Sequence, residues 1–264
     1  MRNLFFLISI IALNTFHNAT FAQKEQPNEI SLFDGKSLNG WYSFAAERGK
    51  DNDVKNVFSV KDGLIHISGE EYGSIVTNEE YENYKLLLEF KWGEKTYAPR
   101  ADRARDSGLL IHSAGPDGGY RGIWMRSIEC QIIEGGTGDL LVVGDGSDSY
   151  ALTATVAKKT STANVFMPGG EPLTIHSGRI DWFGRDPEWR DEKGFRGRND
   201  LEKSLGAWNT IECIARGDSV TIFLNGTLVN QATAVKPSRG RIQIQSEGAE
   251  MFVRKVSLFP LNPH

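Results

Sequence analysis

Two short stretches of the sequence combine a strand-like alternation with side chains that could carry out acid–base chemistry. In residues 127–134, Glu129 and Gln131 alternate with apolar residues, so both point to the same face of a strand. In residues 107–113, His112 is the only ionisable side chain. Carboxylates and imidazoles are the groups that most often move protons in enzymes. We therefore predict that Glu129 and His112 lie side by side on a concave, polar sheet face.

The neighbouring residues favour a ligand site over a plain solvated sheet face, which by itself would also explain Glu129. Gly108 leaves room for a ligand to approach the backbone. Trp124 offers an apolar surface on which a sugar can stack. Asp139 ends a glycine-rich run beyond the strand, and Glu134 joins the face of Glu129 only if a β-bulge intervenes. We treat Glu134 and Asp139 as secondary members of the site.

The C-terminal third supplies a second group of polar residues. Gln245 and Glu247 share one face if their strand continues, and Arg254 follows in the next apolar stretch. Lys203 could add a cation at the same rim, although a lysine is more often a solvated surface residue. We predict that Gln245 or Glu247 opens into the same cleft as Glu129.

A two-residue periodicity dominates the chain and identifies the elements that must position these groups. Ten or more alternating stretches are separated by glycine-rich turns, and residues 225–226, Asn-Gly, are typical of a type I′ hairpin turn. No helical period extends beyond about one turn. The pattern predicts an all-β fold, a two-sheet antiparallel sandwich of jelly-roll type. Two polar, arginine-rich segments, residues 97–106 and 184–203, interrupt it and are expected to wall a cleft.

The first residues predict export. An apolar run over residues 4–13 is too short to span a bilayer, and small residues lead to an expected cleavage after Ala22. We expect a signal peptide over residues 1–22, a disordered leader over 23–29 and one jelly-roll domain over 30–264. The protein would then be periplasmic or extracellular, with no integral membrane segment after removal of the signal.

Composition limits the classes of partner. The formal charge of −4 provides no basic footprint for nucleic acid. The chain has no P-loop, dinucleotide fingerprint or Gly-x-Ser-x-Gly elbow. Its two cysteines, Cys130 and Cys213, make no disulfide framework, so buried reduced thiols are favoured over a single bridge. A small sugar or oligosaccharide is the expected partner.

Several short motifs follow one another in a fixed order. The first reads Leu-Phe-Asp-Gly-Lys-Ser-Leu-Asn-Gly-Trp at residues 32–41. The others lie at residues 106–112, 127–132, 206–209, 225–226, 240–248 and 252–256. As an ordered set they resemble the 3-keto-disaccharide hydrolase family, over roughly residues 30–261. Family members commonly have Glu where Ala207 stands and Pro where Ser204 stands, and neither position carries a group that we assign to chemistry.

The resemblance implies a concanavalin-like jelly roll that cleaves glycosides whose sugar ring carries a 3-keto group. Such a ketone acidifies the C2 hydrogen, so a base removes it, the glycosidic oxygen leaves by elimination and water adds to the product. We assign the base role to Glu129 or His112, and the positive group at the enolate oxygen to Lys203 or a bound divalent cation. Side chains that would bind and orient the sugar are Gln131, Trp124, Gln245, Glu247 and Arg254.

Other interpretations stay open at this point. His112 and nearby carboxylates could hold a divalent metal. The same sandwich could serve as a non-catalytic carbohydrate-binding module. An ordinary laminarinase-like hydrolase needs carboxylates on one strand, and the series Glu129, Gln131, Glu134 copies their spacing with the middle carboxylate neutralised.

Overall fold

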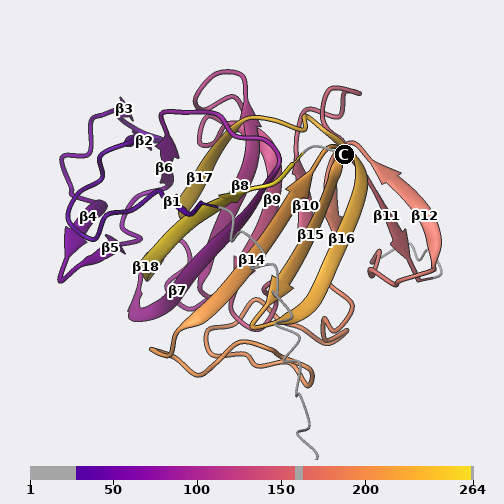
Figure 1. Cartoon of the computed structure of the whole chain (residues 1–264). Helices are drawn as coiled ribbons and strands as arrows, with labels where there is room; N and C mark the ends of the chain where they lie inside the picture. The colour runs from indigo at the N-terminus through magenta and orange to yellow at the C-terminus, as the bar shows by residue number, and fades with distance from the viewer. Residues whose placement is uncertain (1–27, 158–162, 263–264) are drawn as a thin grey trace, which may run out of the picture.

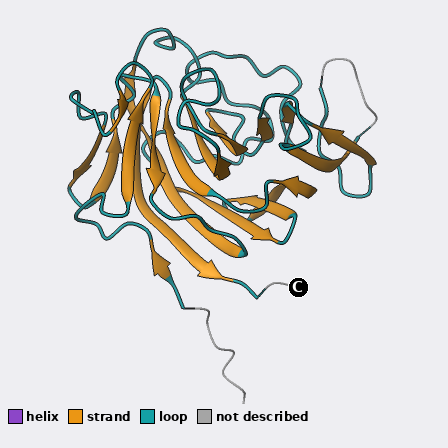
Figure 2. Cartoon of the chain, turned by 90° about the horizontal axis from the view of Figure 1, so that it is seen from above, coloured by secondary structure: helices purple, strands orange, loops and turns teal. Residues whose placement is uncertain are grey.

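The computed structural model describes residues 28–157 and 163–262 as a sandwich of two antiparallel sheets (Figure 1). Within those ranges every regular element is a strand, and Figure 2 shows strands joined by loops. The predicted all-β, two-sheet fold is therefore confirmed. The described residues contain no helix long and apolar enough to cross a membrane. The expected signal peptide, residues 1–22, lies outside the described residues, as does most of the leader.

The ten-stranded sheet is organised around the long strands β7 and β18. In spatial order it contains β12 (Glu171–Ile175), β11 (Ala151–Val156), β16 (Thr227–Lys236), β15 (Ser219–Leu224), β14 (Asn209–Arg216), β7 (Tyr84–Thr96), β18 (Ala249–Pro260), β5 (Leu64–Ile67) and β4 (Phe58–Lys61), with β1 (Ile30–Ser31) paired to β18. The predicted Asn-Gly turn at residues 225–226 joins β15 to β16.

The eight-stranded sheet brings together strands that are far apart in the sequence. In spatial order it contains β13 (Gly178–Ile180), β10 (Leu140–Val143), β9 (Arg126–Ile133), β8 (Asp106–Ala114), β17 (Arg241–Ser246), β6 (Gly73–Thr77), β2 (Trp41–Ala45) and β3 (Gly49–Lys50). Because β17 lies between β8 and β6, the C-terminal third of the chain lies beside the strand that carries Gly108.

Alternation decides which side chains fill the space between the sheets. Along β7, the buried Leu86, Leu88 and Phe90 alternate with half-buried residues, as expected for a strand with one covered face. The eight-stranded sheet contributes Cys130 and the ten-stranded sheet Cys213 to the same core. Both cysteines are free and buried, and burial raises the pKa of the Cys213 thiol to about 12.

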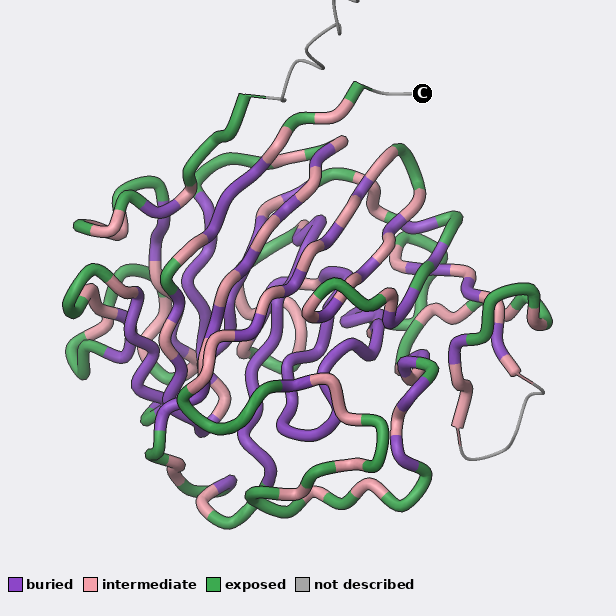
Figure 3. The backbone as a smooth tube through the Cα atoms, turned by 60° about the horizontal axis from the view of Figure 1, so that its bottom comes forward, coloured by how far each residue is buried: buried purple, intermediate pink, exposed green. Residues whose placement is uncertain are grey.

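The central strands of the eight-stranded sheet are buried on both faces. All residues of β8 from Asp106 to Ser113 are buried, whereas β14 in the other sheet alternates buried with half-buried residues. In Figure 3 buried backbone gathers in the middle of the molecule, and exposed segments lie mostly at its periphery. The face of β8, β9 and β17 that points away from the core is therefore covered too, and that face carries polar side chains.

Two long loops lie beside this polar face. Residues 97–105 connect β7 to β8, and residues 181–208 connect β13 to β14, so both segments predicted as loops are loops. Arg100 joins them, with its Nη2 atom 2.8 Å from Asp191 Oδ1. The polar face is thus enclosed by loops that are themselves rich in charge.

At Gly69 the chain passes close to the backbone of Ala249. Gly69 has a φ of +84°, and a Cβ added there would lie 2.5 Å from the backbone carbonyl carbon of Ala249. Gly146 has the same φ of +84° but no atom within 4 Å of its added Cβ. Gly146→Ala should cost about 1–2 kcal/mol for the left-handed backbone alone. Gly69→Ala should cost at least about 2 kcal/mol more, because the backbone of Ala249 must shift.

Denaturant titration of both variants measures the two losses of unfolding free energy. Equal losses would show that the crossing at Ala249 does not constrain the fold.

Candidate functional site

Gly108 forms the floor of the site. It lies opposite Gln131 on β9, and the pairing of Leu109 with Ile244 puts Gln245 of β17 on its other side. A Cβ on Gly108 would overlap the Oε1 atoms of both Glu129 and Gln245, so these two side chains lean over the glycine from opposite sides. Any larger residue would collide with these two oxygen atoms, so the glycine is what lets both side chains approach the backbone of β8.

Two further carboxyl groups lie at the next position along the strands. Asp106 begins β8, and continuing the register between β8 and β17 places Glu247 opposite it. Asp106 is buried and Glu247 is half-buried. The site therefore holds three carboxyl groups close to Gly108, those of Asp106, Glu129 and Glu247.

A chain of polar contacts holds one side of the cluster. Arg100 Nη2 lies 3.1 Å from Asp106 Oδ2, and Gln131 Nε2 donates a hydrogen bond of 2.6 Å to Asp106 Oδ1. Arg179 donates to Gln131 Oε1 at 3.3 Å and forms an ion pair of 2.9 Å with Asp139. Asp106 and Asp139 are thus partnered carboxylates, and Gln131 connects them through Arg179.

Burial raises the pKa of all three carboxyls, and that of Asp106 rises to about 7 although Arg100 and Arg179 oppose the effect. Removal from water, followed by repulsion from Asp106, raises the pKa of Glu129 to about 8. Burial, followed by the charges of Asp106 and Glu129, raises the pKa of Glu247 well above its ordinary value. Arg179 and Arg100 oppose this effect on Glu247 without cancelling it. The cluster therefore retains protons near neutral pH, as an acid–base pair requires.

Gln245 has an unusual position for a buried amide. Its side chain is 1% exposed, and neither Nε2 nor Oε1 has a hydrogen-bond partner among the described residues. Buried polar atoms are nearly always paired in folded proteins. By contrast, Gln243 two residues earlier is fully occupied, since it accepts from Ser74 and donates to Ser113. Gln245 therefore offers one donor and one acceptor to a ligand above Gly108.

The structure corrects the predicted position of His112. A β-bulge between Ile111 and Ala114 breaks the alternation of β8, and His112 takes a φ of +51°. Its ring points into the core and meets the Tyr84 ring of the opposite sheet, with 6.0 Å between centroids. Burial lowers the pKa of His112 to about 4, although its hydrogen bond to Pro237 O opposes this. His112 and Glu129 do not share a face.

Trp124 lies at the β6 side of the same face and packs against a residue that the sequence did not single out. Its ring is only 8% exposed, and its Nε1 donates to Gly73 O at 3.3 Å. The ring stacks on Tyr72, with centroids 6.3 Å apart and planes inclined by 25°. Tyr72 directly precedes β6 and has no motif around it, so periodicity provided no signal for it.

Arg254 and Lys203 lie outside the cluster, which corrects two further expectations. Arg254 belongs to β18 of the ten-stranded sheet, where it pairs with Glu89 and covers the Trp208 ring at 4.5 Å. Lys203 is exposed, and its backbone N–H donates to Asn209 Oδ1 at 2.8 Å. The guanidinium groups next to the carboxyls come instead from the loops around β8 and from β13, at Arg100 and Arg179.

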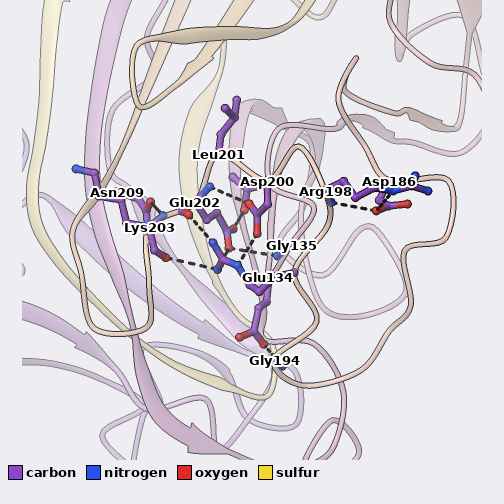
Figure 4. Close-up of polar contacts among 12 residues, drawn as sticks. Glu134, Gly135, Asp186, Gly194, Arg198, Asp200, Leu201, Glu202, Lys203 and Asn209 are labelled. Atoms are coloured by element: carbon purple, nitrogen blue, oxygen red, sulfur yellow. Dashed lines mark hydrogen bonds and ion pairs between the residues drawn. The ribbon is translucent and has the colours of Figure 1, made fainter.

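The secondary residues Glu134 and Asp139 support the loop over residues 181–208. Glu134 forms a buried ion pair of 2.7 Å with Arg105 and accepts from the backbone N–H of Gly194 at 2.9 Å. Figure 4 shows Glu134 beside Glu202, whose carboxylate accepts from the backbone N–H of Gly135. Asp139 pairs with arginines and accepts from the backbone of residue 182. These carboxylates are occupied, so Glu134 does not continue a laminarinase-like series with Glu129.

The described residues contain no group of three histidine, cysteine, aspartate or glutamate side chains arranged to hold a metal ion.

The sandwich with its polar, doubly covered sheet defines a concanavalin-like jelly-roll protein. Two crystal structures from Parabacteroides distasonis, each described as a candidate glycosyl hydrolase, are similar to it. One is 17% identical, covers 89% of this chain and 94% of its own, and has a TM-score of 0.50. The other is 19% identical, covers 89% and 100%, and has a TM-score of 0.52. At this identity the likeness shows the fold alone, and no curated protein matches the chain.

The family itself is shown by the sequence. The model of the 3-keto-alpha-glucoside-1,2-lyase-like domain matches residues 28–258. The chain belongs to this family, which confirms the resemblance drawn from its motifs. Membership supports a carbohydrate-active function for the protein.

The raised pKa of Glu129 has a consequence for stability that is independent of activity. Between about pH 4.5 and pH 8 the folded state holds a proton that the unfolded state has lost, so stability falls as the pH rises. Glu129→Gln removes this titration. We predict that the variant is more stable than the unmodified protein at pH 8, by on the order of 4 kcal/mol, and that the difference shrinks toward pH 5.

Urea titrations at several pH values measure this difference, with Glu212→Gln on the half-buried face of β14 as the control. Parallel stability curves for Glu129→Gln and the unmodified protein would mean that Glu129 is not held in its protonated form.

Proposed function

We propose that this protein cleaves 3-keto-glycosides by eliminating the glycosidic oxygen across C1 and C2 and then adding water. The observation that carries the proposal is the arrangement around Gly108. There, Glu129 and Glu247 have raised pKa values and lie beside the unpartnered amide of Gln245. Family membership supports the 3-keto substrate class.

The reaction needs one group to remove a proton and another to deliver one. In the proposed mechanism the ionised carboxylate of Glu129 takes the C2 proton, and the C–H electron pair forms an enolate with the C3 ketone. The ketone then reforms, a double bond forms between C1 and C2, and the C1–O bond breaks. The protonated carboxyl of Glu247 gives its proton to the departing oxygen. Water then adds across the double bond to give the free 3-keto sugar.

A buried cluster of carboxyls can supply both the base and the acid that this reaction needs. Two carboxylates close to each other repel, so the ionisation of one raises the pKa of the other. One carboxyl therefore keeps its proton at a pH at which the other has lost it. The pKa of Glu129, at about 8, suits a base that works near neutral pH. Glu247 is the member beside Asp106, whose charge favours its protonated form.

Charge on the enolate oxygen also has candidate partners. The side chain of Arg179 is 38% exposed and interacts electrostatically with Glu129. Gln245, beside Gly108, has an amide N–H without a partner among the described residues. A guanidinium and an amide donor directed at a developing oxyanion lower the barrier by stabilising the charge where it forms. Arg179 thus takes the role that the sequence suggested for Lys203.

Activity of the Glu129→Gln variant tests the base assignment. The substitution keeps the shape of the side chain but removes the group that accepts the proton, so release of aglycone from a 3-keto-glucoside should fall by about 10²-fold or more. Glu212→Gln should keep full activity. In the unmodified protein, kcat/KM should rise with pH through about pH 8, since only the ionised form of Glu129 is a base.

A flat pH profile together with an active Glu129→Gln variant would move the base to another residue. An unmodified protein that binds the keto-sugar but never releases aglycone would be a carbohydrate-binding module.

We also propose that the protein is exported, as the apolar run at residues 4–13 and the small residues before Gln23 suggest. Expression of the full chain in a Gram-negative host should give a periplasmic product whose first residue is Gln23. Mass spectrometry of the fractionated cells measures this, and an intact chain retained in the cytoplasm would contradict it.

A further inference from the structure

The site is bordered on one side by an aromatic pair. Gly73 of β6 pairs with Ser246 of β17, so the register places Tyr72 next to Glu247 at the end of these strands. Tyr72 lies on the same face as Ser74, which hydrogen-bonds Gln243 on the polar side of β17. The tyrosine ring is therefore adjacent to the acid cluster and on the face that carries it.

Trp124 holds the Tyr72 ring in place. The two rings are nearly parallel, and their centroids, 6.3 Å apart, leave no room for a third ring between them. Trp124 is 8% exposed and anchored through Nε1 to Gly73 O, whereas Tyr72 is half-buried. Trp124 thus backs the stack, and the outer face of Tyr72 is the surface that a ligand can reach.

The order of the groups across the sheet fixes a direction for the substrate. Glu129 lies on β9, Gly108 on β8, Gln245 and Glu247 on or directly after β17, and Tyr72 directly before β6. In the proposed reaction the base acts at C2 and the acid at the glycosidic oxygen. The bond that breaks is therefore on the Glu247 side of the sugar, and the departing group extends toward Tyr72.

We infer that Tyr72, backed by Trp124, forms the leaving-group subsite and selects glycosides whose aglycone has a flat, apolar face, such as a phenol. This inference rests on the proposed function for its direction, but the stacking itself does not require a reaction. Apolar and aromatic rings stack on tyrosine with a preference of about 3- to 10-fold in affinity. Glycosides with a methyl aglycone lack this contact.

Binding of unoxidised glucosides tests the subsite without any turnover. Calorimetry compares phenyl with methyl glucoside, in both anomers, for the unmodified protein, Tyr72→Phe and Tyr72→Ala. The unmodified protein and Tyr72→Phe should bind the phenyl glucoside about 3- to 10-fold more tightly. Tyr72→Ala should bind the two glucosides equally. Thermal melts of each variant check that the fold is retained, and the 3-keto forms bound to Glu129→Gln provide a second ligand pair.

The outcomes separate this inference from the proposed function. Three results would overturn the subsite. The unmodified protein shows no preference for the phenyl glucoside, the preference survives in Tyr72→Ala, or neither ligand pair binds. A phenyl preference that needs Tyr72, in a protein that releases no aglycone from 3-keto-glucosides, keeps the subsite and removes the proposed reaction. Aglycone release with no phenyl preference keeps the reaction and removes the subsite.

Discussion

The burial of several carboxyl groups on one face of a β-sheet is the constraint on which the rest of this structure depends. An antiparallel sheet normally leaves its second face in water, where carboxyl groups ionise readily because water solvates the charge. In this protein β8, β9 and β17 are covered on both faces, so each acidic side chain must find a partner or keep its proton. Asp106 has partners in Arg100 and Gln131, yet burial still raises its pKa to about 7. Burial also raises the pKa of Glu129, to about 8, and that of Glu247.

Other buried carboxylates close to this cluster stabilise the structure. Glu134 and Asp139 are each satisfied by guanidinium and backbone donors, and removing one of their partners would leave a buried charge that costs several kcal/mol. They hold the loop over residues 181–208 against the end of β9 and the start of β10, through backbone N–H groups of that loop. Burial likewise keeps the pKa of Glu129 high.

Alternation along the strands made much of this arrangement predictable, and interruptions of that alternation account for the errors. Glu129 and Gln131 share a polar face, and Gln245 lies near Glu129, because these strands keep a strict two-residue period. The period fails for His112, where one bulge turns the side chain into the core. It also cannot say to which sheet a strand belongs, so Arg254 was assigned to a cleft that it does not reach. The roles of these residues in catalysis stay predictions.

Tyr72 and Arg179 show a different limit, since no local pattern distinguishes them from other tyrosines and arginines. Each becomes relevant only through pairings between strands distant in sequence, β6 with β17 for Tyr72 and β10 with β13 for Arg179. The same pairings argue against a laminarinase-like mechanism. The two carboxyls to which we assign the chemistry are Glu129 on β9 and Glu247 directly after β17, so they do not follow one another along β9. At the middle position on β9, Gln131 gives its amide hydrogens to Asp106 and Ser107. Gln131 therefore fixes the position of Asp106, and the proposed chemistry is assigned to Glu129 and Glu247 instead.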